Sequence, residues 1–260
     1  MAPLYALFSV VSYGIFLASF LYAIGFVGNF LVPKSVDGPA GPGGWLAFAL
    51  DALVLALFAV QHSVMARPAF KRAWTRIVSP VIERSVYVLV SSLLLALIFW
   101  AWQPLPGILW DWRGTPAGEM LGAIYALGWA IVLLSTFMIS HFELFGLTQA
   151  WRNVRNRPTQ QAPFRVVLLY RLVRHPIMLG FVIAFWSAPV MTYGHLLFAV
   201  LTTGYILVGI RLEERDLMTT FGAAYARYRE HVPMLIPIPK ASQQRAGKPE
   251  SSAAGPGEST

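Results

Sequence analysis

Hydrophobic residues are gathered along this chain into long segments separated by shorter polar and charged stretches. The apolar segments run over Leu4–Leu31, Trp45–Met65, Tyr87–Trp102, Met120–His141, Ile177–Met191 and His195–Ile210. A helix that crosses a bilayer needs about 20 apolar residues, and about 17 to 25 is the usual range. The pattern therefore predicts an all-α, polytopic transmembrane bundle of about six spans. The fifth segment is short and Pro189 closes it, so five spans plus a re-entrant hairpin is the alternative.

Composition supports this fold class and narrows the partners. Of 260 residues, 57% are hydrophobic and only 12% are charged, whereas a soluble domain carries about 25% charged residues. The formal net charge of +8 would favour nucleic acid in a soluble protein. Here the basic residues flank apolar segments, so membrane topology and anionic lipid explain them better. We expect contact with the lipid bilayer, no nucleic acid and no obligate protein partner. The lack of cysteine excludes disulfides and cysteine-ligated metal.

Basic residues alternate between rich and poor connections. The rich ones follow the second, fourth and sixth apolar segments, and the poor ones carry only Lys34 with Asp37 and Asp111 with Arg113. Rich connections stay in the cytoplasm by the positive-inside rule. We therefore expect an integral protein of a bacterial inner membrane with both termini cytoplasmic. The opposite face should carry an aromatic belt formed by Trp100, Trp102, Trp110 and Trp112.

The domain organisation is simple. We expect one integral membrane domain over residues 1–239, with a candidate cofactor region at about 164–239. From residue 240 to 260 the chain is rich in Ser, Gly, Pro, Lys and Glu and has almost no large apolar residue. Such a segment cannot bury enough surface to become ordered, which predicts a disordered polar tail.

Several ionisable residues should meet at the cytoplasmic ends of the apolar segments. They are His62, Glu83, Arg84, His141, His175, Glu213 and Glu214. Each one alone is explained by capping or by snorkelling to the interface. Because ionisable groups at membrane depth usually face the bundle interior or a water-filled cavity, their convergence at one level favours a shared pocket. No metal is expected, because the two histidines His62 and His141 have no short-range ligand spacing and no H-E-x-x-H occurs.

The triplet Arg174-His175-Pro176 opens the fifth apolar segment. Proline suits the first turn of a helix, and the residue before it is held extended. The free N–H groups of that first turn then attract an anion such as a carboxylate. An ordinary proline-started helix with basic interface anchors explains the same triplet, so it is weak evidence by itself.

The pair Glu213-Glu214 ends the sixth segment, where the helix dipole disfavours negative charge. Arg211 and Arg215 compensate in a purely structural interpretation. In a functional one, a carboxylate accepts hydrogen bonds from ribose hydroxyls or from an ammonium group. Phe221, Tyr225 and Tyr228 follow along one helical stripe. Such a stripe usually packs, although aromatic faces also suit a sulfonium ion through cation–π attraction.

Taken together, Arg174-His175-Pro176, Leu179-Gly180, Glu213-Glu214, Phe221-Gly222, Tyr225, Tyr228 and Val232-Pro233 resemble the C-terminal cofactor region of the isoprenylcysteine carboxyl methyltransferase-like superfamily. The resemblance covers roughly residues 164–239 and implies S-adenosylmethionine as cofactor. The cofactor-binding residues it implies are Tyr170, Arg174, His175, Pro176, Ile177, Met178, Glu213, Glu214, Tyr225 and Tyr228. Members of the superfamily often have tyrosine where this chain has Met178, so any hydrogen bond from that phenol is lost here.

A second resemblance extends over most of the chain. The segments Gln61–Arg67, Glu83–Leu89, Ser140–Leu147 and Leu212–Leu217 are similar to those of the bacterial methanethiol S-methyltransferases. This resemblance implies methylation of a small volatile thiol, methanethiol, to dimethyl sulfide. The alternatives are a methyltransferase acting on a prenylcysteine carboxylate or a phospholipid amine, and a non-enzymatic membrane protein such as a small transporter or an NnrU-like protein.

Methyl transfer to a thiol needs alignment of three atoms and a supply of thiolate, which is the nucleophile. His62 and His141 are the candidate general bases, because imidazole titrates near neutral pH. His141 is slightly favoured because it precedes the segment that leads into the cofactor region. Arg84 is the third candidate catalytic residue, since it could stabilise a thiolate electrostatically. The sequence does not choose among them.

Overall fold

The structure is a computed structural model that describes residues 1–39, 43–158 and 164–238. Five long helices dominate the described part: α1 (Ala2–Gly28), α2 (Gly44–Ala66), α4 (Glu83–Ala101), α5 (Pro116–Ile139) and α9 (Tyr193–Phe221). The shorter elements are α3 (Pro68–Trp74), β1 (Ile108–Asp111), α6 (His141–Leu144), α7 (Leu147–Val154), the 3-10 helix η1 (Leu168–Arg171), α8 (Pro176–Trp186), β2 (Val190–Thr192) and α10 (Ala223–His231). The predicted polar tail lies outside the described residues.

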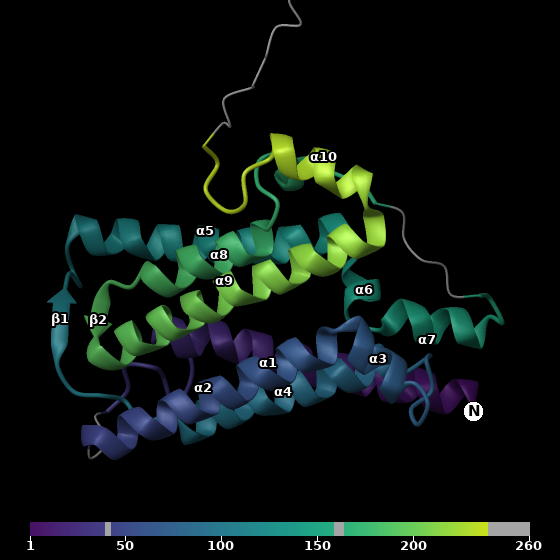
Figure 1. The fold of residues 1–260 in the computed structure, drawn as a ribbon. Helices are drawn as coiled ribbons and strands as arrows, with labels where there is room; N and C mark the ends of the chain where they lie inside the picture. Colours follow the sequence, from purple (N-terminus) through teal and green to yellow (C-terminus); the bar gives the residue numbers. More distant parts are fainter. Residues whose placement is uncertain (40–42, 159–163, 239–260) are drawn as a thin grey trace, which may run out of the picture.

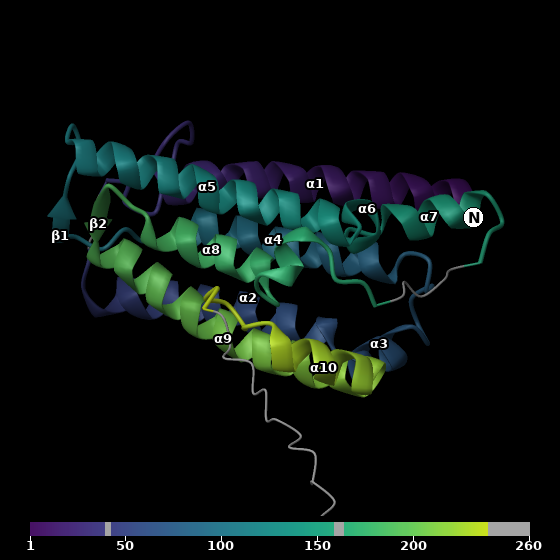
Figure 2. The same cartoon turned by 90° about the horizontal axis from the view of Figure 1, so that it is seen from above.

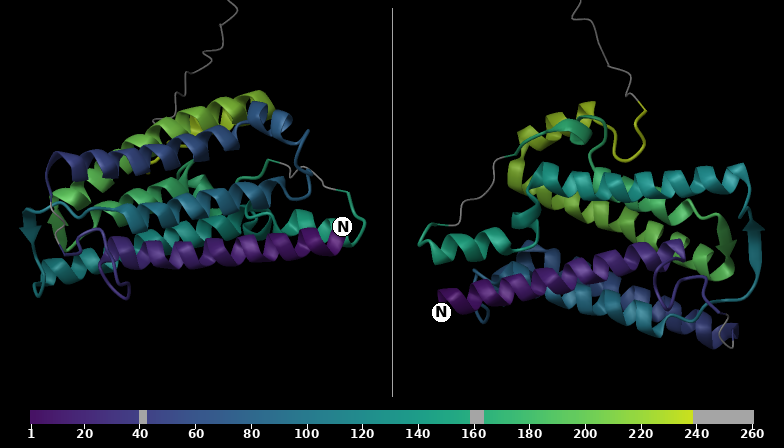
Figure 3. Two further views of the ribbon diagram at one scale, coloured as in Figure 1. Left: turned by 90° about the horizontal axis from the view of Figure 1, so that it is seen from below. Right: turned by 180° about the vertical axis from the view of Figure 1, so that it is seen from behind.

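The long helices form two layers. In Figure 1, α5, α8 and α9 make the upper layer, and α1, α2 and α4 make the lower one. Viewed from above, α4 lies between α1 and α2, and α8 lies between α5 and α9 (Figure 2). The axes of all these helices are roughly aligned with one another, so the bundle has two distinct ends. The strands occupy one end, and the N-terminus, α3, α6 and α7 occupy the other (Figure 3).

Five helices among the described residues are long and apolar enough to cross a membrane. Large apolar side chains are exposed along them, including Leu4, Leu46 and Leu53. Exposed apolar surface of this extent is stable only against lipid. The predicted all-α membrane bundle is confirmed, and the chain is an integral membrane protein.

The fifth apolar segment differs from a full span. It forms α8, an 11-residue helix, which extends about 16 Å at 1.5 Å per residue and is too short for a hydrocarbon core of about 30 Å. After a break at Ser187–Pro189 the chain continues as β2, which pairs antiparallel with β1. The bundle therefore has five full-length spans and one short helix, α8, which still carries the chain to the strand end, so that α1 begins and α9 ends at the same end of the bundle (Figure 2).

Two glycines allow α8 to pack directly on α5. A Cβ atom on Gly128 would lie 2.8 Å from the carbonyl oxygen of Gly180, and one on Gly180 would lie 2.6 Å from that of Gly128. Any side chain at either position would push the two helices apart. Small residues at helix interfaces permit this close approach, which lets a short helix be held firmly inside a membrane bundle.

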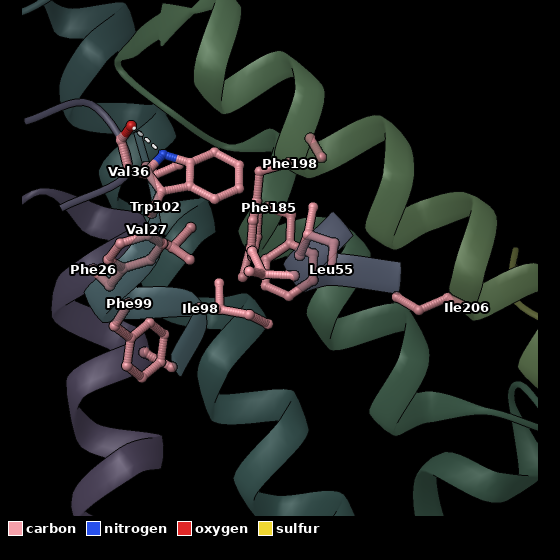
Figure 4. Packing of buried hydrophobic residues seen from close by; sticks show 14 of the residues in the cluster. Phe26, Val27, Val36, Leu55, Ile98, Phe99, Trp102, Phe185, Phe198 and Ile206 are labelled. Carbon is pink, nitrogen blue, oxygen red and sulfur yellow. Dashed lines mark hydrogen bonds between the residues drawn. The ribbon is translucent and has the colours of Figure 1, made fainter. Parts of the chain in front are cut away.

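The main apolar core lies towards the strand end (Figure 4). Trp102 is fully buried there, and its Nε1–H donates to the carbonyl oxygen of Val36 at 3.1 Å. The rings of Phe26 and Phe198 lie edge-on to it at 6.1 and 5.7 Å, and Phe99 packs on Phe26. The expected tryptophan belt is therefore wrong for Trp102, because its indole N–H finds a buried backbone acceptor. Trp100, in contrast, is 77% exposed.

A buried ion pair ties the first connection to the start of α9 at the strand end. The Nδ1 atom of His195 lies 2.7 Å from Oδ2 of Asp37, and its Nε2 lies 3.0 Å from the carbonyl oxygen of Phe185. That carbonyl has no helical partner, because the fourth residue after it is Pro189, which lacks an N–H. Both partners of His195 are acceptors, so the ring donates from both nitrogens and forms an ion pair with Asp37.

We predict that Asp37→Asn destabilises the protein strongly. His195 is 1% exposed, and removing one partner of a buried ion pair typically costs about 3–5 kcal/mol. Thermal unfolding of the detergent-purified variant should show a large fall in Tm. The matched control is Asp111→Asn, whose carboxylate pairs with Arg113 at the exposed surface of the same end. Equal Tm values for the two variants would contradict a structural role for the Asp37–His195 pair.

Candidate functional site

The end of the bundle opposite the strands gathers most of the residues that the sequence singled out. Arg174 and His175 precede α8, which begins at Pro176 because the proline cannot continue a preceding helix. Glu213 and Glu214 lie near the end of α9. Gly222, at φ 51°, separates α9 from α10. This turn folds α10 back over α9 (Figures 1 and 2).

Arg174 holds these elements together. Its Nε and Nη2 atoms each lie 2.7 Å from Oε1 of Glu214, and Nη1 donates to the carbonyl oxygens of Arg229 and Val232 at 2.9 and 3.0 Å. The side chains of Arg174 and Glu214 are 7% and 12% exposed. The guanidinium therefore connects the chain before α8 to α9 and to the end of α10. A charge-assisted contact of this kind is strong where water is excluded.

His175 lies between the two carboxylates. Its Nε2 lies 3.1 Å from Oε1 of Glu214, and its Nδ1 lies 3.6 Å from Oε2 of Glu213. Burial acts to lower the pKa of His175, but Glu213 and Glu214 outweigh it and raise that pKa. Glu213 remains 46% exposed. Of the carboxylate pair, Glu214 is thus engaged within the protein and Glu213 is open to a ligand.

Aromatic rings cover this group on the side of α10. The ring of Phe164 lies 5.2 Å from Phe221, 6.0 Å from Tyr225 and 5.4 Å from Tyr228. Tyr228 Oη donates to the carbonyl oxygen of Tyr170 at 2.6 Å. Tyr225 is 1% exposed and its hydroxyl has no hydrogen-bond partner among the described residues. A buried hydroxyl without a partner is costly, so this phenol is suited to a bound ligand.

Tyr170 belongs to the same region. Burial raises the pKa of its phenol, and the negative charge of Glu213 adds to the effect. Ile177 and Met178 follow Pro176 in the first turn of α8, whose N-terminus has no side-chain cap. Met178 packs against the main apolar core. The ten predicted cofactor residues are thus brought to one end of the molecule. Arg174, Glu214 and Tyr228 nevertheless form hydrogen bonds with partners inside the protein.

A surface hollow of about 510 Å³ lies on the outer side of the Arg174–Glu214 ion pair. Its lining comes from α9 and α10 and consists of Arg211, Glu214, Arg215, Met218, Thr219 and Arg229. Three of these side chains are guanidinium groups, so the hollow is polar and favours anions.

His62 forms a separate polar cluster inside the bundle. Its Nε2 lies 2.8 Å from the hydroxyl of Tyr87, and its Nδ1 lies 3.2 Å from Oγ of Ser91. Ser91 donates in turn to Oε1 of Gln61 at 3.4 Å. The imidazole stacks on Phe58, with ring centroids 5.2 Å apart. We call His62, Tyr87, Ser91 and Gln61 the histidine–tyrosine cluster.

Arg84 lies beside this cluster. Its guanidinium carbon is 4.9 Å from the ring centroid of Tyr87, and its Nε donates to the carbonyl oxygen of Leu144 at 2.6 Å. Tyr87 is also within electrostatic range of Arg67, Tyr205 and Glu213. Glu213 therefore lies between His175 and the histidine–tyrosine cluster.

His141 is placed elsewhere, at the junction of α5 and α6. Its Nε2 lies 2.8 Å from the hydroxyl of Tyr13, and its Nδ1 lies 2.8 Å from Oγ1 of Thr136. The ring stacks on Phe137 at 4.2 Å. Burial lowers the pKa of His141. The structure thus joins His62 and Arg84 through Tyr87, and it puts His141 in a different aromatic environment against α1.

Sequence reasoning missed Tyr87, although a signal was present. Tyr87 follows Arg84 by three residues and precedes Ser91 by four, so all three lie on one face of α4. The tyrosine looked like the first residue of an apolar segment. The described residues contain no group of three metal-ligating side chains, and the expectation of no metal rests on the sequence argument.

Comparison with known proteins decides the family. The NnrU protein family matches residues 52–215, which is more than half of the chain. The chain belongs to this family. It is 53% identical to the methanethiol S-methyltransferase of Mycobacterium tuberculosis over 90% of this chain and 96% of that protein. It is 52% identical to methanethiol S-methyltransferase 2 of Bradyrhizobium diazoefficiens over 89% of both chains.

A more distant relative is Nurim of Mus musculus, which is 30% identical over 77% of this chain and 87% of that protein. No solved structure matches the chain. The matched range of this NnrU-family chain contains His62, Arg84, His141, His175 and both carboxylates of α9, so the family signal covers most of the candidate site.

We predict that the protein loses stability as the pH rises above neutral. The pKa of His175 is raised in the folded state above an unfolded value of about 6.5. Its stabilising contribution is therefore complete below that value and is lost as pH rises through the folded pKa. Tm in detergent, measured from about pH 6 to 9, should fall. His175→Gln should flatten this dependence, while His231→Gln on the exposed face of α10 should preserve it. A slope unchanged in His175→Gln would be inconsistent with the charged contact.

Proposed function

We propose that this protein is an S-adenosylmethionine-dependent thiol S-methyltransferase that converts methanethiol to dimethyl sulfide within a membrane. The observation that carries the proposal is 53% identity to a methanethiol S-methyltransferase along nearly the whole of both chains. Such coverage includes both the carboxylate region of α9 and the histidine–tyrosine cluster. The proposed substrate is a small apolar thiol, which agrees with a bundle whose main core is apolar.

The residues at the end of the bundle opposite the strands fit S-adenosylmethionine. Glu213 offers an exposed carboxylate for an ammonium group or a ribose hydroxyl. The first turn of α8 offers N–H groups to a carboxylate, because it lacks a side-chain cap. The hydroxyl of Tyr225 is buried and has no partner among the described residues. When bound, the cofactor supplies an electrophilic methyl group on a sulfonium sulfur.

The protein side chains then divide into two groups by their contacts. Glu213, Tyr170 and Tyr225 would hold the cofactor, and aromatic rings favour a sulfonium ion through cation–π attraction. Arg174, His175 and Glu214 fix the positions of α8, α9 and α10 relative to one another through the buried ion pair. Pro176, Ile177 and Met178 fix the start of α8, and Tyr228 fixes Tyr170.

Proton removal from the thiol is assigned to the histidine–tyrosine cluster. His62 is the proposed base, and the guanidinium of Arg84 stabilises negative charge beside it. His141 is the less suitable candidate, because its partners are Tyr13 and Thr136 and its neighbours are phenyl rings. A neutral imidazole with an ordered partner on its far nitrogen is poised to accept a proton.

We further propose that the site end faces the cytoplasm, in a bacterial inner membrane, with both termini on that side. The connections at this end carry most of the arginines, and those at the strand end carry Lys34 and Arg113. This asymmetry follows the positive-inside rule, and the cytoplasm is where S-adenosylmethionine is made. Residues 1–239 then form a single catalytic domain.

The alternatives use other acceptors or no chemistry. A prenylcysteine carboxylate or a phospholipid amine would need a groove for long chains, and two relatives that are 52% and 53% identical to this chain are named for methanethiol. A non-enzymatic NnrU-like protein would not need the ordered histidine–tyrosine cluster. Neither alternative is favoured.

Purified protein supplied with S-adenosylmethionine and methanethiol should release dimethyl sulfide into the headspace. Gas chromatography measures the product, and a reaction without protein gives the background rate. Parallel reactions with a prenylcysteine and with a phosphatidylethanolamine vesicle should transfer little methyl group. Faster methylation of either alternative acceptor, or no dimethyl sulfide above background, would refute the proposed substrate.

We predict that Glu213→Gln weakens S-adenosylmethionine binding by about 1.5–3 kcal/mol, because it removes a charged hydrogen-bond acceptor. Calorimetry on the detergent-purified variant measures this. The matched control is Glu230→Gln on α10, an exposed carboxylate near the hollow but not beside His175. An affinity unchanged in Glu213→Gln would remove Glu213 from the cofactor site.

A further inference from the structure

The hydrogen bonds of the histidine–tyrosine cluster have a fixed direction. Ser91 donates its only hydroxyl proton to Oε1 of Gln61, so its oxygen accepts from Nδ1–H of His62 at 3.2 Å. A neutral imidazole carries one proton, and this contact places it on Nδ1. Nε2 is therefore the acceptor, and Tyr87 donates to it at 2.8 Å. The order runs from Tyr87 through His62 and Ser91 to Gln61.

This order leaves the histidine without a free nitrogen. Nδ1 is bound to Ser91, Nε2 is bound to Tyr87, and the ring face is covered by Phe58 at 5.2 Å. Tyr205 approaches from α9 with its ring at 83° to the imidazole. A thiol could reach Nε2 only by displacing the phenol. The phenolic oxygen, in contrast, has accepting capacity left after it donates to His62.

Charged and titratable groups surround Tyr87 from several helices. Arg84 of α4 lies over its ring, Arg67 between α2 and α3 is within electrostatic range, and Tyr205 and Glu213 face it from α9. The phenol of Tyr87 is thus flanked by two cations and by the carboxylate of Glu213. Glu213 is the candidate cofactor residue, so Tyr87 lies on the side of the cluster that faces the proposed methyl donor.

We propose that Tyr87, and not His62, touches the thiol and relays its proton. This inference rests on the proposed thiol methylation. The sulfur–hydrogen bond breaks and its proton passes to the phenolic oxygen, while the tyrosine's own proton moves to Nε2 of His62. The sulfur forms its new bond to the methyl carbon as the sulfonium–carbon bond breaks. One proton leaves the thiol, one resides on the imidazole, and the tyrosine ends neutral. Tyr87 is then the catalytic residue. Ser91 orients His62, and His62 accepts the proton of the tyrosine hydroxyl.

The chain contains a natural control for this arrangement. Tyr13 lies 2.8 Å from Nε2 of His141, His141 contacts Thr136 through Nδ1, and Thr136 donates to the carbonyl oxygen of Leu133 at 2.7 Å. The hydrogen-bond order is the same as in the histidine–tyrosine cluster. The ring of His141 is surrounded by Phe137, Phe142 and Phe145. Glu213 is an electrostatic neighbour of Tyr87, whereas burial is the cause that acts on His141.

The decisive experiment compares Tyr87→Phe with Tyr13→Phe. Each substitution removes one hydroxyl oxygen and leaves the ring. Tyr87→Phe should lower kcat for methanethiol by about 10²-fold or more with unchanged S-adenosylmethionine affinity, whereas Tyr13→Phe should stay within about threefold. Because a relay acts as a unit, the double variant Tyr87→Phe, His62→Ala should be no slower than the slower single variant.

A second readout separates a relay from a merely structural role. With a more acidic thiol such as trifluoroethanethiol, or at higher pH, thiolate forms without help. The loss in Tyr87→Phe should then shrink. Ser91→Ala, which releases Nδ1 of His62, should lose about tenfold in kcat with the same dependence on thiol acidity. This variant carries the test if Tyr87→Phe fails to fold.

Three outcomes would overturn the relay. They are a Tyr87→Phe or Ser91→Ala enzyme as fast as Tyr13→Phe, losses that multiply in the double variant, and losses equal for acidic and ordinary thiols. Each of them requires an active wild-type enzyme. A wild type that makes no dimethyl sulfide would refute the proposed function instead, so the two failures are distinguishable.

Discussion

The ion pair between Arg174 and Glu214 is the contact on which the arrangement of the candidate site depends. One guanidinium group bridges the chain before α8, the last turns of α9 and the end of α10. A buried charge pair contributes little net stability compared with apolar packing, but breaking it is costly. Its effect is therefore to specify one arrangement of three elements. Because Arg174 holds Glu214, its neighbour Glu213 keeps a half-exposed carboxylate beside His175.

The membrane explains why the bundle is fixed at its ends by polar contacts. Lipid offers no hydrophobic driving force for association, so helices pack through close contacts and hydrogen bonds. Gly128 against Gly180 provides such a contact in the middle of the upper layer. The Asp37–His195 pair joins separate segments at the strand end, and the Arg174–Glu214 pair joins α9 to the chain before α8 at the opposite end. Between them, apolar side chains face either the core or lipid.

The two tyrosine–histidine pairs have the same local geometry and differ in the residues that surround them. Tyr87–His62 and Tyr13–His141 have the same distance and the same hydrogen-bond order. In the described part of the chain, the guanidinium of Arg84 lies over Tyr87, which also has Glu213 as an electrostatic neighbour, while phenyl rings surround His141. Chemistry of a thiol needs a stabilised negative charge next to the methyl donor, and that requirement is met by the position of α4 relative to α9 and not by the pair itself.

The sequence by itself determined the fold class, the ends of most long helices and the residues around Arg174-His175-Pro176 and Glu213-Glu214. These follow from local rules: runs of apolar residues make spans, proline starts a helix, and charges stay at the membrane surface. Tertiary structure alone decided that Trp102 is a core residue and that His62 and His141 lie in separate clusters. Each of these depends on which side chains from distant segments come within hydrogen-bonding or packing distance. Tyr87 is the clearest case, because its partners His62 and Glu213 come from helices far from it in the chain, and periodicity within α4 cannot reveal them.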